Sequence, residues 1–187
     1  MRFRLLVASM LVIVLAGASL FARHRRWPVK VLRDADAERV DMRPVPSSVA
    51  HLGALPTPVT WLLGGPVNHR LGPIEYRTFE VAADLKGLKT ESDGDYHIVI
   101  ADRADPSKVM IVEIPAPREN PKLAAEFGQA RTAVDEHLGK PERNIRWVQP
   151  RKVRVVGVGF FDRLTNDQES PAPNGIELHP VLKITFE

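Results

Sequence analysis

The 187-residue chain contains no cysteine, and this absence excludes three kinds of protein. A disulfide-stabilised scaffold, a thiolate zinc site and a cysteine nucleophile all require a residue type that the chain lacks. Standard catalytic motifs are missing as well, since no Gly-x-Ser-x-Gly, His-Glu-x-x-His or phosphate-binding loop occurs. The apolar fraction of 44% is still sufficient for a packed core. We therefore expect an ordered domain that folds without disulfide partners.

An apolar run free of charge extends from Leu5 to Ala22. The basic residues before it and the small residues Ala16-Gly17-Ala18 are typical of a secretory leader. If the run is not cleaved, it is just long enough to span a bilayer as a helix. The basic flank at 23–26 resists translocation, and cytoplasmic retention is the alternative. We expect export to the periplasm or another extracytoplasmic space, with anchoring to the inner membrane by residues 5–22 if the leader is kept.

The basic charge of the chain is concentrated in this leader. The chain has 26 Lys+Arg and 23 Asp+Glu, and five of the arginines lie in residues 1–26. The remainder holds 21 basic and 23 acidic residues, a net charge of −2. The basic balance therefore indicates membrane targeting and hardly supports nucleic-acid binding.

The rest of the chain divides into a Pro-rich linker over 27–72 and a folded domain over 73–187. Prolines interrupt the linker at six positions and disfavour long regular elements. Apolar and β-rich runs then predict five strands. The first is long, alternating and bent at Gly87, the third is apolar on both faces, and the fifth alternates. A helical stripe between Asn120 and Gly139 separates the third strand from the fourth. The other four predicted strands are Tyr96–Ala101, Lys108–Ile114, Lys152–Phe161 and Gly175–Phe186.

This order of elements is that of the OB-fold, a five-stranded Greek-key barrel with a helix between strands three and four. The sequence thus predicts a mainly β, OB-like barrel preceded by an N-terminal apolar helix and a Pro-rich linker. An open antiparallel sheet with one helix packed on it is the alternative.

Four strings of the domain resemble those of an uncharacterised family of exported bacterial proteins. They are Gly94–Ile100, Met110–Pro115, Gly157–Asp162 and Asn174–Pro180. The resemblance implies export and one compact domain, and it implies no activity.

A shorter stretch resembles the thermonuclease-like (staphylococcal-nuclease-type) OB-fold enzymes, which place Asp-Gly-Asp at the first hairpin, here 93–95. In that family an Arg and a calcium-binding Asp follow, and the matching positions hold Lys108 and Glu113. The general-base Glu of the family corresponds to Ala116. The resemblance implies a metal-dependent phosphodiesterase, but Lys lacks the bidentate grip of Arg, and Ala116 cannot activate water.

Two pairs of polar residues each share one face of a strand. Asp95 and His97 form the first pair, and Glu177 and His179 form the second. We take Asp95, His97 and Glu113 as catalytic candidates, and the candidate metal ligands are Asp93, Asp95, Glu177 and His179. A solvated outer face is the simpler interpretation of the two pairs, and for Glu113 we favour a structural ion pair with Arg131 or Arg118 over a ligand role.

A basic group with an aromatic residue, Arg146, Trp147 and Arg151, is a candidate ligand surface. Such a combination is typical of single-strand nucleic-acid binding, where bases stack on the ring. The alternative is a solvated loop whose Trp anchors the barrel.

These observations favour an exported cell-envelope binding or scaffold domain without enzymatic activity. Its partners would be the membrane, through an uncleaved N-terminal segment, and a protein, glycan or nucleic-acid ligand. No cofactor is required by this interpretation. The alternative function, a metal-dependent phosphodiesterase or nuclease, would use a divalent ion at the Asp/His/Glu cluster.

Overall fold

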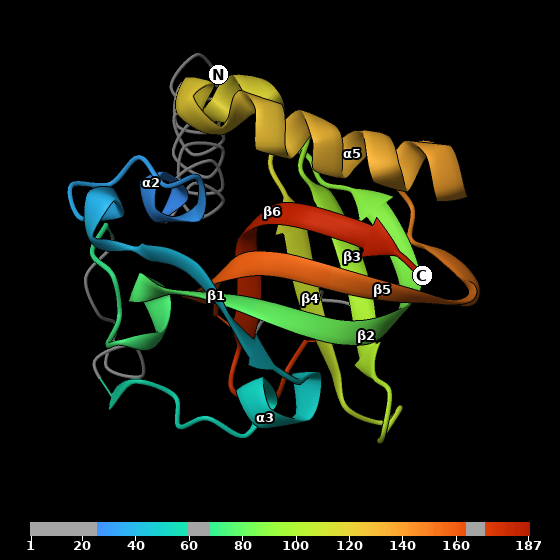
Figure 1. Ribbon diagram of the computed structural model, residues 1–187, viewed down its shortest axis with the longest axis horizontal. Coiled ribbons are helices and arrows are strands. Elements are labelled where there is room, and N and C mark those ends of the chain that lie inside the picture. The colour runs from blue at the N-terminus through green and yellow to red at the C-terminus, as the bar shows by residue number, and fades with distance from the viewer. Residues whose placement is uncertain (1–25, 60–67, 164–170) are drawn as a thin grey trace, which may run out of the picture.

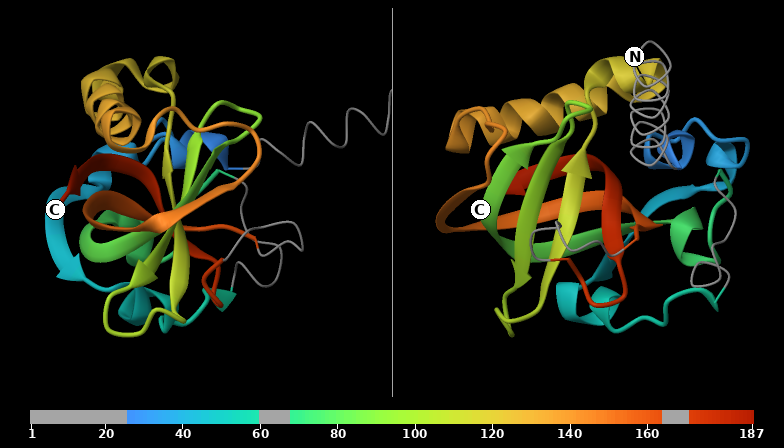
Figure 2. Two further views of the ribbon diagram at one scale, coloured as in Figure 1. Left: turned by 90° about the vertical axis from the view of Figure 1, so that its right-hand side faces the viewer. Right: turned by 180° about the vertical axis from the view of Figure 1, so that it is seen from behind.

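The computed structural model describes residues 26–59, 68–163 and 171–187, and its centre is one six-stranded sheet. The strands are β1 (Asp41–Ser47), β2 (Arg77–Thr90), β3 (Tyr96–Asp102), β4 (Val109–Ile114), β5 (Arg146–Phe161) and β6 (Ile176–Phe186). They follow the order β1-β2-β3-β4-β6-β5, and a further β2–β5 pairing closes the sheet into a ring (Figures 1 and 2). The predicted mainly β class is confirmed, and the closed ring excludes the open sheet.

The interior of the ring is filled by every second residue of the strands. Ile98 of β3, Val112 of β4 and Leu178 of β6 are fully buried in one apolar core. Successive side chains of a strand point to opposite faces of the sheet. The chain neighbours of these three residues, His97, Glu113 and Glu177, therefore face outward from the ring.

The bend predicted in the first strand lies where expected. The register of β2 against β3 and β5 shifts between Leu85 and Gly87. A Cβ atom at Gly87 would lie 2.7 Å from the indole ring of Trp147. Glycine is therefore needed here because the neighbouring ring occupies the space of a side chain.

One main helix, α5 (Ala124–Leu138), lies along one end of the ring (Figure 1). The Asn120 side chain accepts a hydrogen bond from the backbone N–H of Lys122 and caps the short 3₁₀ turn that precedes the helix. The helix buries Phe127, packs Ala130 and Val134 into the core of the ring, and ends at Gly139. The predicted helix and its bounding signals are thus confirmed.

The segment expected to be a linker folds onto the ring in the part that the structure describes. It contains α2 (Trp27–Lys30), a 3₁₀ turn (Ala37–Arg39), β1 and α3 (Val49–Gly53), and β1 pairs in parallel with β2. Several apolar side chains of this segment are buried, among them Val29, Val31, Val49 and Leu52, whereas Met42 and Val45 of β1 stay exposed. The prolines shorten the elements but leave these side chains free to pack. Two prolines lie in β1, the edge strand, which needs fewer backbone donors.

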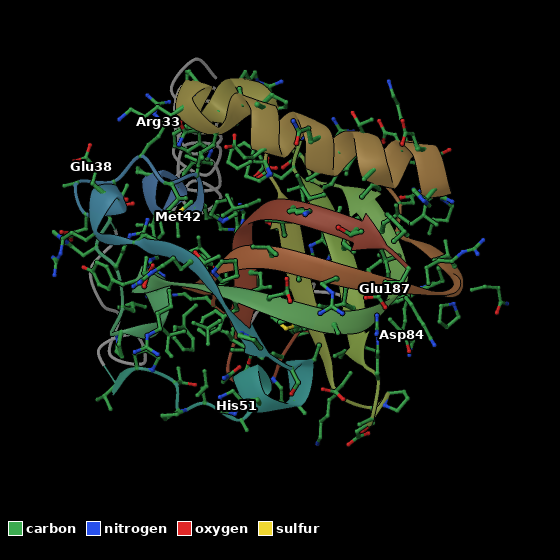
Figure 3. The ribbon with its side chains drawn as sticks, in the orientation of Figure 1. Arg33, Glu38, Met42, His51, Asp84 and Glu187 are labelled. Carbon is green, nitrogen blue, oxygen red and sulfur yellow. The ribbon has the colours of Figure 1, made fainter. Side chains whose placement is uncertain are left out.

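The outer side of this segment is exposed, with Met42 44% accessible and Arg33 on the surface (Figure 3). The predicted leader covers residues 1–26, and all of it except the buried Arg26 lies outside the described residues, as does the N-terminal apolar helix. Within the described ranges, no helix has the length and apolar character needed to cross a membrane.

Candidate metal centre

Three strands bring polar side chains together on the outer face of the ring. Antiparallel pairing places His97 of β3 directly opposite Glu113 of β4. Parallel pairing of β4 with β6 places Glu177 opposite Ile111, so Glu177 and His179 lie beside Glu113. Asp95 immediately precedes β3. Residues far apart in the sequence thus form one group, which we call the polar cluster: Asp95, His97, Glu113, Glu177 and His179.

Glu113 lies between the two histidines of the cluster. Its Oε1 atom is 2.9 Å from Nδ1 of His97, and its Oε2 atom is 3.0 Å from Nδ1 of His179. The other ring nitrogen of His179, Nε2, lies 3.4 Å from Oδ2 of Asp95. Oδ1 of Asp95 accepts a hydrogen bond from the backbone N–H of Ala116. The His179 imidazole therefore lies between two carboxylates, one from the hairpin before β3 and one from β4.

The polar cluster is buried, although it faces outward from the ring. The exposed fraction is 2% for Asp95 and 1% for His179, and the other three members are buried as well. The alternative of a solvated outer face is therefore wrong. Alternation indicates which side of a strand a residue occupies, but it cannot show whether another segment covers that side.

Residues 26–32, which we call the strap, contribute to this cover. Nζ of Lys30 lies 3.0 Å from Oδ2 of Asp162 and 3.8 Å from Oε2 of Glu113. Both Arg26 and Lys30 stack over the ring of Phe160, which in turn packs edge-on against His179. The strap, which lies at the end of the predicted leader, is therefore in direct contact with the polar cluster.

The charges of the cluster are strongly coupled. Burial raises the pKa of Glu177 well above its usual range, and the carboxylates of Asp162 and Glu113 raise it further. Burial also acts to raise the pKa of Glu113, but Lys30 and the two histidines outweigh it and hold this pKa well below normal. Glu113 is thus the anionic centre of the cluster, whereas Glu177 is held toward its neutral form.

His179 and Lys30 are the two positively charged side chains of the group, and the neighbouring carboxylates stabilise their charge. Burial acts to lower the pKa of His179, but its contacts with Asp95 and Glu113 raise this pKa to about 9. Burial likewise opposes the charge on Lys30, and the attraction of Asp162, Glu113 and Glu177 raises its pKa well above normal. At neutral pH, His179 and Lys30 therefore supply positive charge that compensates the carboxylates of the cluster.

Two sets of side chains in the described residues can each hold one metal ion. Ligand atoms of Asp95, Glu113 and His179 all lie within 4.8 Å of one another, and so do those of Glu91, His97 and Glu113. Mixed carboxylate and imidazole ligands suit zinc and manganese. In addition, Oε2 of Glu177 is buried without a hydrogen-bond partner among the described residues. The donor set of carboxylates and imidazoles fits a divalent cation, and Glu177 belongs to neither ligand set.

The structure brings together most of the predicted site residues. Asp95, His97, Glu113 and His179 meet directly, and Glu177 borders them. Asp93 remains half-buried in the hairpin, where its Oδ1 atom accepts the N–H of Asp95. Burial, followed by the neighbouring Asp95 and Glu113 carboxylates, raises the pKa of Asp93.

The expected pairing of Glu113 with Arg131 or Arg118 is wrong. Arg131 donates to the carbonyl oxygen of Gly94 and lies over the ring of Tyr96, and Arg118 donates to the carbonyl oxygen of Asp93. Both arginines satisfy backbone groups of the hairpin. Glu113 is instead paired with the two histidines and Lys30.

Sequence reasoning missed three contributors to the centre: Lys30, Glu91 and Asp162. Lys30 lies in the expected linker, and Asp162 directly follows the last residue of β5. Glu91 lies 3.5 Å from His97 and comes from the end of a hairpin. The only available signal was the concentration of acidic residues around the strand ends, which does not specify contacts.

The basic group lies elsewhere, in the first half of β5 rather than in a loop. Arg146 donates to the carbonyl oxygen of Leu138 at the end of α5, and Trp147 covers Gly87 while remaining 55% exposed. Arg151 is exposed and pairs in register with Leu85 of β2. Strand β5 is longer than predicted because these residues pair with β2.

No family model matches the chain, and no curated protein or solved structure gives a significant match. Both resemblances noted in the sequence therefore stay predictions.

Proposed function

We propose that the protein is an exported cell-envelope binding or scaffold domain, built on an OB-like barrel and stabilised by a divalent cation in its polar cluster. The pairing order of β2 to β6, with α5 between β4 and β5, supports the OB-like assignment. In this interpretation β1 is an added edge strand. The export part rests on the apolar run and basic start of the sequence alone.

Burial of the polar cluster is the observation that carries the non-enzymatic interpretation. The outer surface around strands two and three is the usual ligand face of an OB-fold, and here it corresponds to β3 and β4. Asp95, Glu113 and His179 are each at most 6% exposed on that face. A phosphodiester needs direct access to the metal and to attacking water, whereas a structural ion needs enclosure. The enclosure of the polar cluster therefore supports a structural cation that holds β3, β4 and β6 together.

The test is calorimetric titration of zinc and manganese into the full chain purified in detergent. We expect one ion per chain, and we expect Asp95→Asn and His179→Gln to abolish binding because each removes a ligand. Asp93→Asn is the matched control, since Asp93 neighbours the cluster without joining it, and this variant should bind normally. The proposal would be contradicted if neither the wild-type chain nor Lys30→Met bound either ion. The variant is included because it removes the positive charge next to Glu113.

The second candidate function is a metal-dependent phosphodiesterase or nuclease. The convergence of Asp95, Glu113 and His179 within 4.8 Å favours it. Ala116, buried where the resemblance would require a general base, speaks against it. Incubating single-stranded and double-stranded DNA with the protein and calcium, manganese or zinc separates the two functions. Cleavage that Glu113→Gln abolishes would establish the enzyme, and absence of cleavage supports the binding domain.

Export is tested separately with a reporter enzyme that is active only outside the cytoplasm, fused after Glu187. We expect activity, whereas a silent reporter would mean that the basic flank at 23–26 determines the topology.

For the macromolecular ligand, the exposed Trp147 and its basic neighbours Arg146 and Arg151 remain the proposed surface. Loss of ligand capture on Trp147→Ala would support this surface.

A further inference from the structure

We propose that Lys30 is a built-in competitor of the divalent cation: its ammonium group occupies the position beside Glu113, and an ion that binds the cluster displaces the Lys30 side chain. The inference rests on the proposed cation site and adds its regulation. It assigns to the strap the function of setting the affinity of that site.

The contact geometry places Lys30 against a prospective ligand atom. Its Nζ atom lies 3.8 Å from Oε2 of Glu113, the same oxygen that contacts Nδ1 of His179 at 3.0 Å. A divalent ion held by Glu113 and His179 would lie within a few ångströms of this ammonium. Like charges at such a separation repel strongly in a partly buried environment. The ion and the ammonium therefore exclude one another.

The Lys30 side chain is able to leave because it lies at the rim of the cluster. It is 17% exposed, and Asp162, its closest partner, is 30% exposed. The side chain of His179, by contrast, is fully enclosed. Rotation of the Lys30 side chain toward solvent exchanges the contact with Asp162 for hydration and leaves the backbone of the strap in place.

The backbone of the strap is anchored at both ends, so only the side chain needs to move. At the first end Arg26 forms hydrogen bonds with Glu75 and with the carbonyl oxygen of Phe161. At the second end Nδ2 of Asn120 donates to the carbonyl oxygens of Val31 and Leu32. These anchors hold Lys30 next to the cluster, where its local concentration as a competitor is high.

Competition between two ligands is reciprocal, and it predicts two linked effects. Removing the ammonium should strengthen binding of the ion, and binding of the ion should expose the ammonium. The first effect is measured as a dissociation constant. The second is measured as the rate at which an amine-acetylating reagent modifies Lys30, read by mass spectrometry.

We compare the full-length wild-type chain with Lys30→Met and Lys30→Arg in zinc and manganese titrations. Lys30→Met keeps the length of the side chain without its charge and should lower the dissociation constant by about tenfold or more. Lys30→Arg keeps the charge and should bind as weakly as the wild type. Equal affinities of the wild type and Lys30→Met would overturn the inference while leaving the cation site intact. Absence of binding in both would overturn the cation site itself.

The labelling experiment uses wild-type protein with and without saturating manganese. Lys30 should be acetylated several times faster with the ion, whereas Lys122, whose side chain is 85% exposed, should react at the same rate in both states. In His179→Gln the ion should leave the Lys30 rate unchanged. If the ion binds the wild type and Lys30 labelling does not rise, the inference is wrong.

Discussion

Arg26 and Glu75 form a buried ion pair that joins the start of the strap to the turn before β2. Nη1 of Arg26 lies 2.8 Å from Oε1 of Glu75, and both side chains are at most 1% exposed. Glu75 also accepts the backbone N–H groups of Leu71 and Phe161. The pair thus connects three segments of the chain around one carboxylate, and every oxygen of that carboxylate has a partner.

Replacing Arg26 by Ala should lower the free energy of unfolding by about 3–5 kcal/mol, because it leaves the Glu75 carboxylate buried without its counter-ion. Denaturant titration monitored by tryptophan fluorescence measures the loss. Arg33→Ala is the control, since Arg33 is exposed on the same segment and should change stability by no more than about 0.5 kcal/mol. Equal effects of the two variants would contradict the structural importance of the pair.

Two N-terminal truncations should differ sharply in stability. A chain that begins at Arg23 retains Arg26, whereas a chain that begins at Trp27 lacks it. We expect the shorter chain to unfold at a lower denaturant concentration, with a deficit of about 3 kcal/mol or more. Leader cleavage after Ala18 or Ala22 would leave Arg26 in place. Identical midpoints would show that the fold does not use this residue.

The two buried glutamates should respond in opposite ways to substitution by Gln. Glu177→Gln should raise stability at pH 8 by about 1–3 kcal/mol, because burial and the Asp162 and Glu113 carboxylates already oppose its ionisation. Glu75→Gln should lower stability, since it removes the negative charge that Arg26 requires. Thermal unfolding of both variants at pH 8 is the measurement. A destabilised Glu177→Gln would show that its charge is needed.

In ion-free protein, stability should fall as the pH rises from about 6.5 through about 9, where His179 loses its proton. The folded-state pKa of His179 is about 9, above its unfolded value of about 6.5. Its contribution is therefore fully present below the lower value and lost above the higher one, with a span of about 3 kcal/mol at most. The raised pKa of Glu177 acts in the same direction.

Denaturation midpoints measured between pH 6 and pH 10 test this dependence. His179→Gln should flatten the decline, because the charges that face it, Asp95, Glu113 and Lys30, then have no titrating partner. His137→Gln, at the exposed end of α5, should retain the wild-type slope. An unchanged slope in His179→Gln would assign the decline to another group.

A close contact at the bend of β2 makes a double-mutant test possible. Gly87→Ala should cost about 1–3 kcal/mol, because the new Cβ would lie 2.7 Å from the Trp147 ring. In a Trp147→Ala background the same change should cost much less, since the clashing ring is gone. Additive effects in the thermodynamic cycle would show that the ring does not occupy this space.

The amino-acid sequence alone determined the local elements of the ring. Strict alternation identified the faces of β2 and β6, apolar β-rich runs located β3 and β4, and Asn120 and Gly139 marked the limits of the helical segment. The same alternation placed His97 on the face of Asp95, and His179 on the face of Glu177. These predictions succeed because the pleat of a strand and the capping of a helix depend on residues close together in the chain.

Only the tertiary structure decided what these faces contact. The parallel pairing of β4 with β6 joins Glu113 to His179, and no local pattern encodes a contact across more than sixty residues. Lys30 joins the cluster because Val29 and Val31 bury their side chains and hold the strap on the ring. The alternation of these polar residues suggests a solvated surface, but burial makes them a coupled charge cluster. The interaction between two charges becomes stronger when the fold excludes solvent from around them.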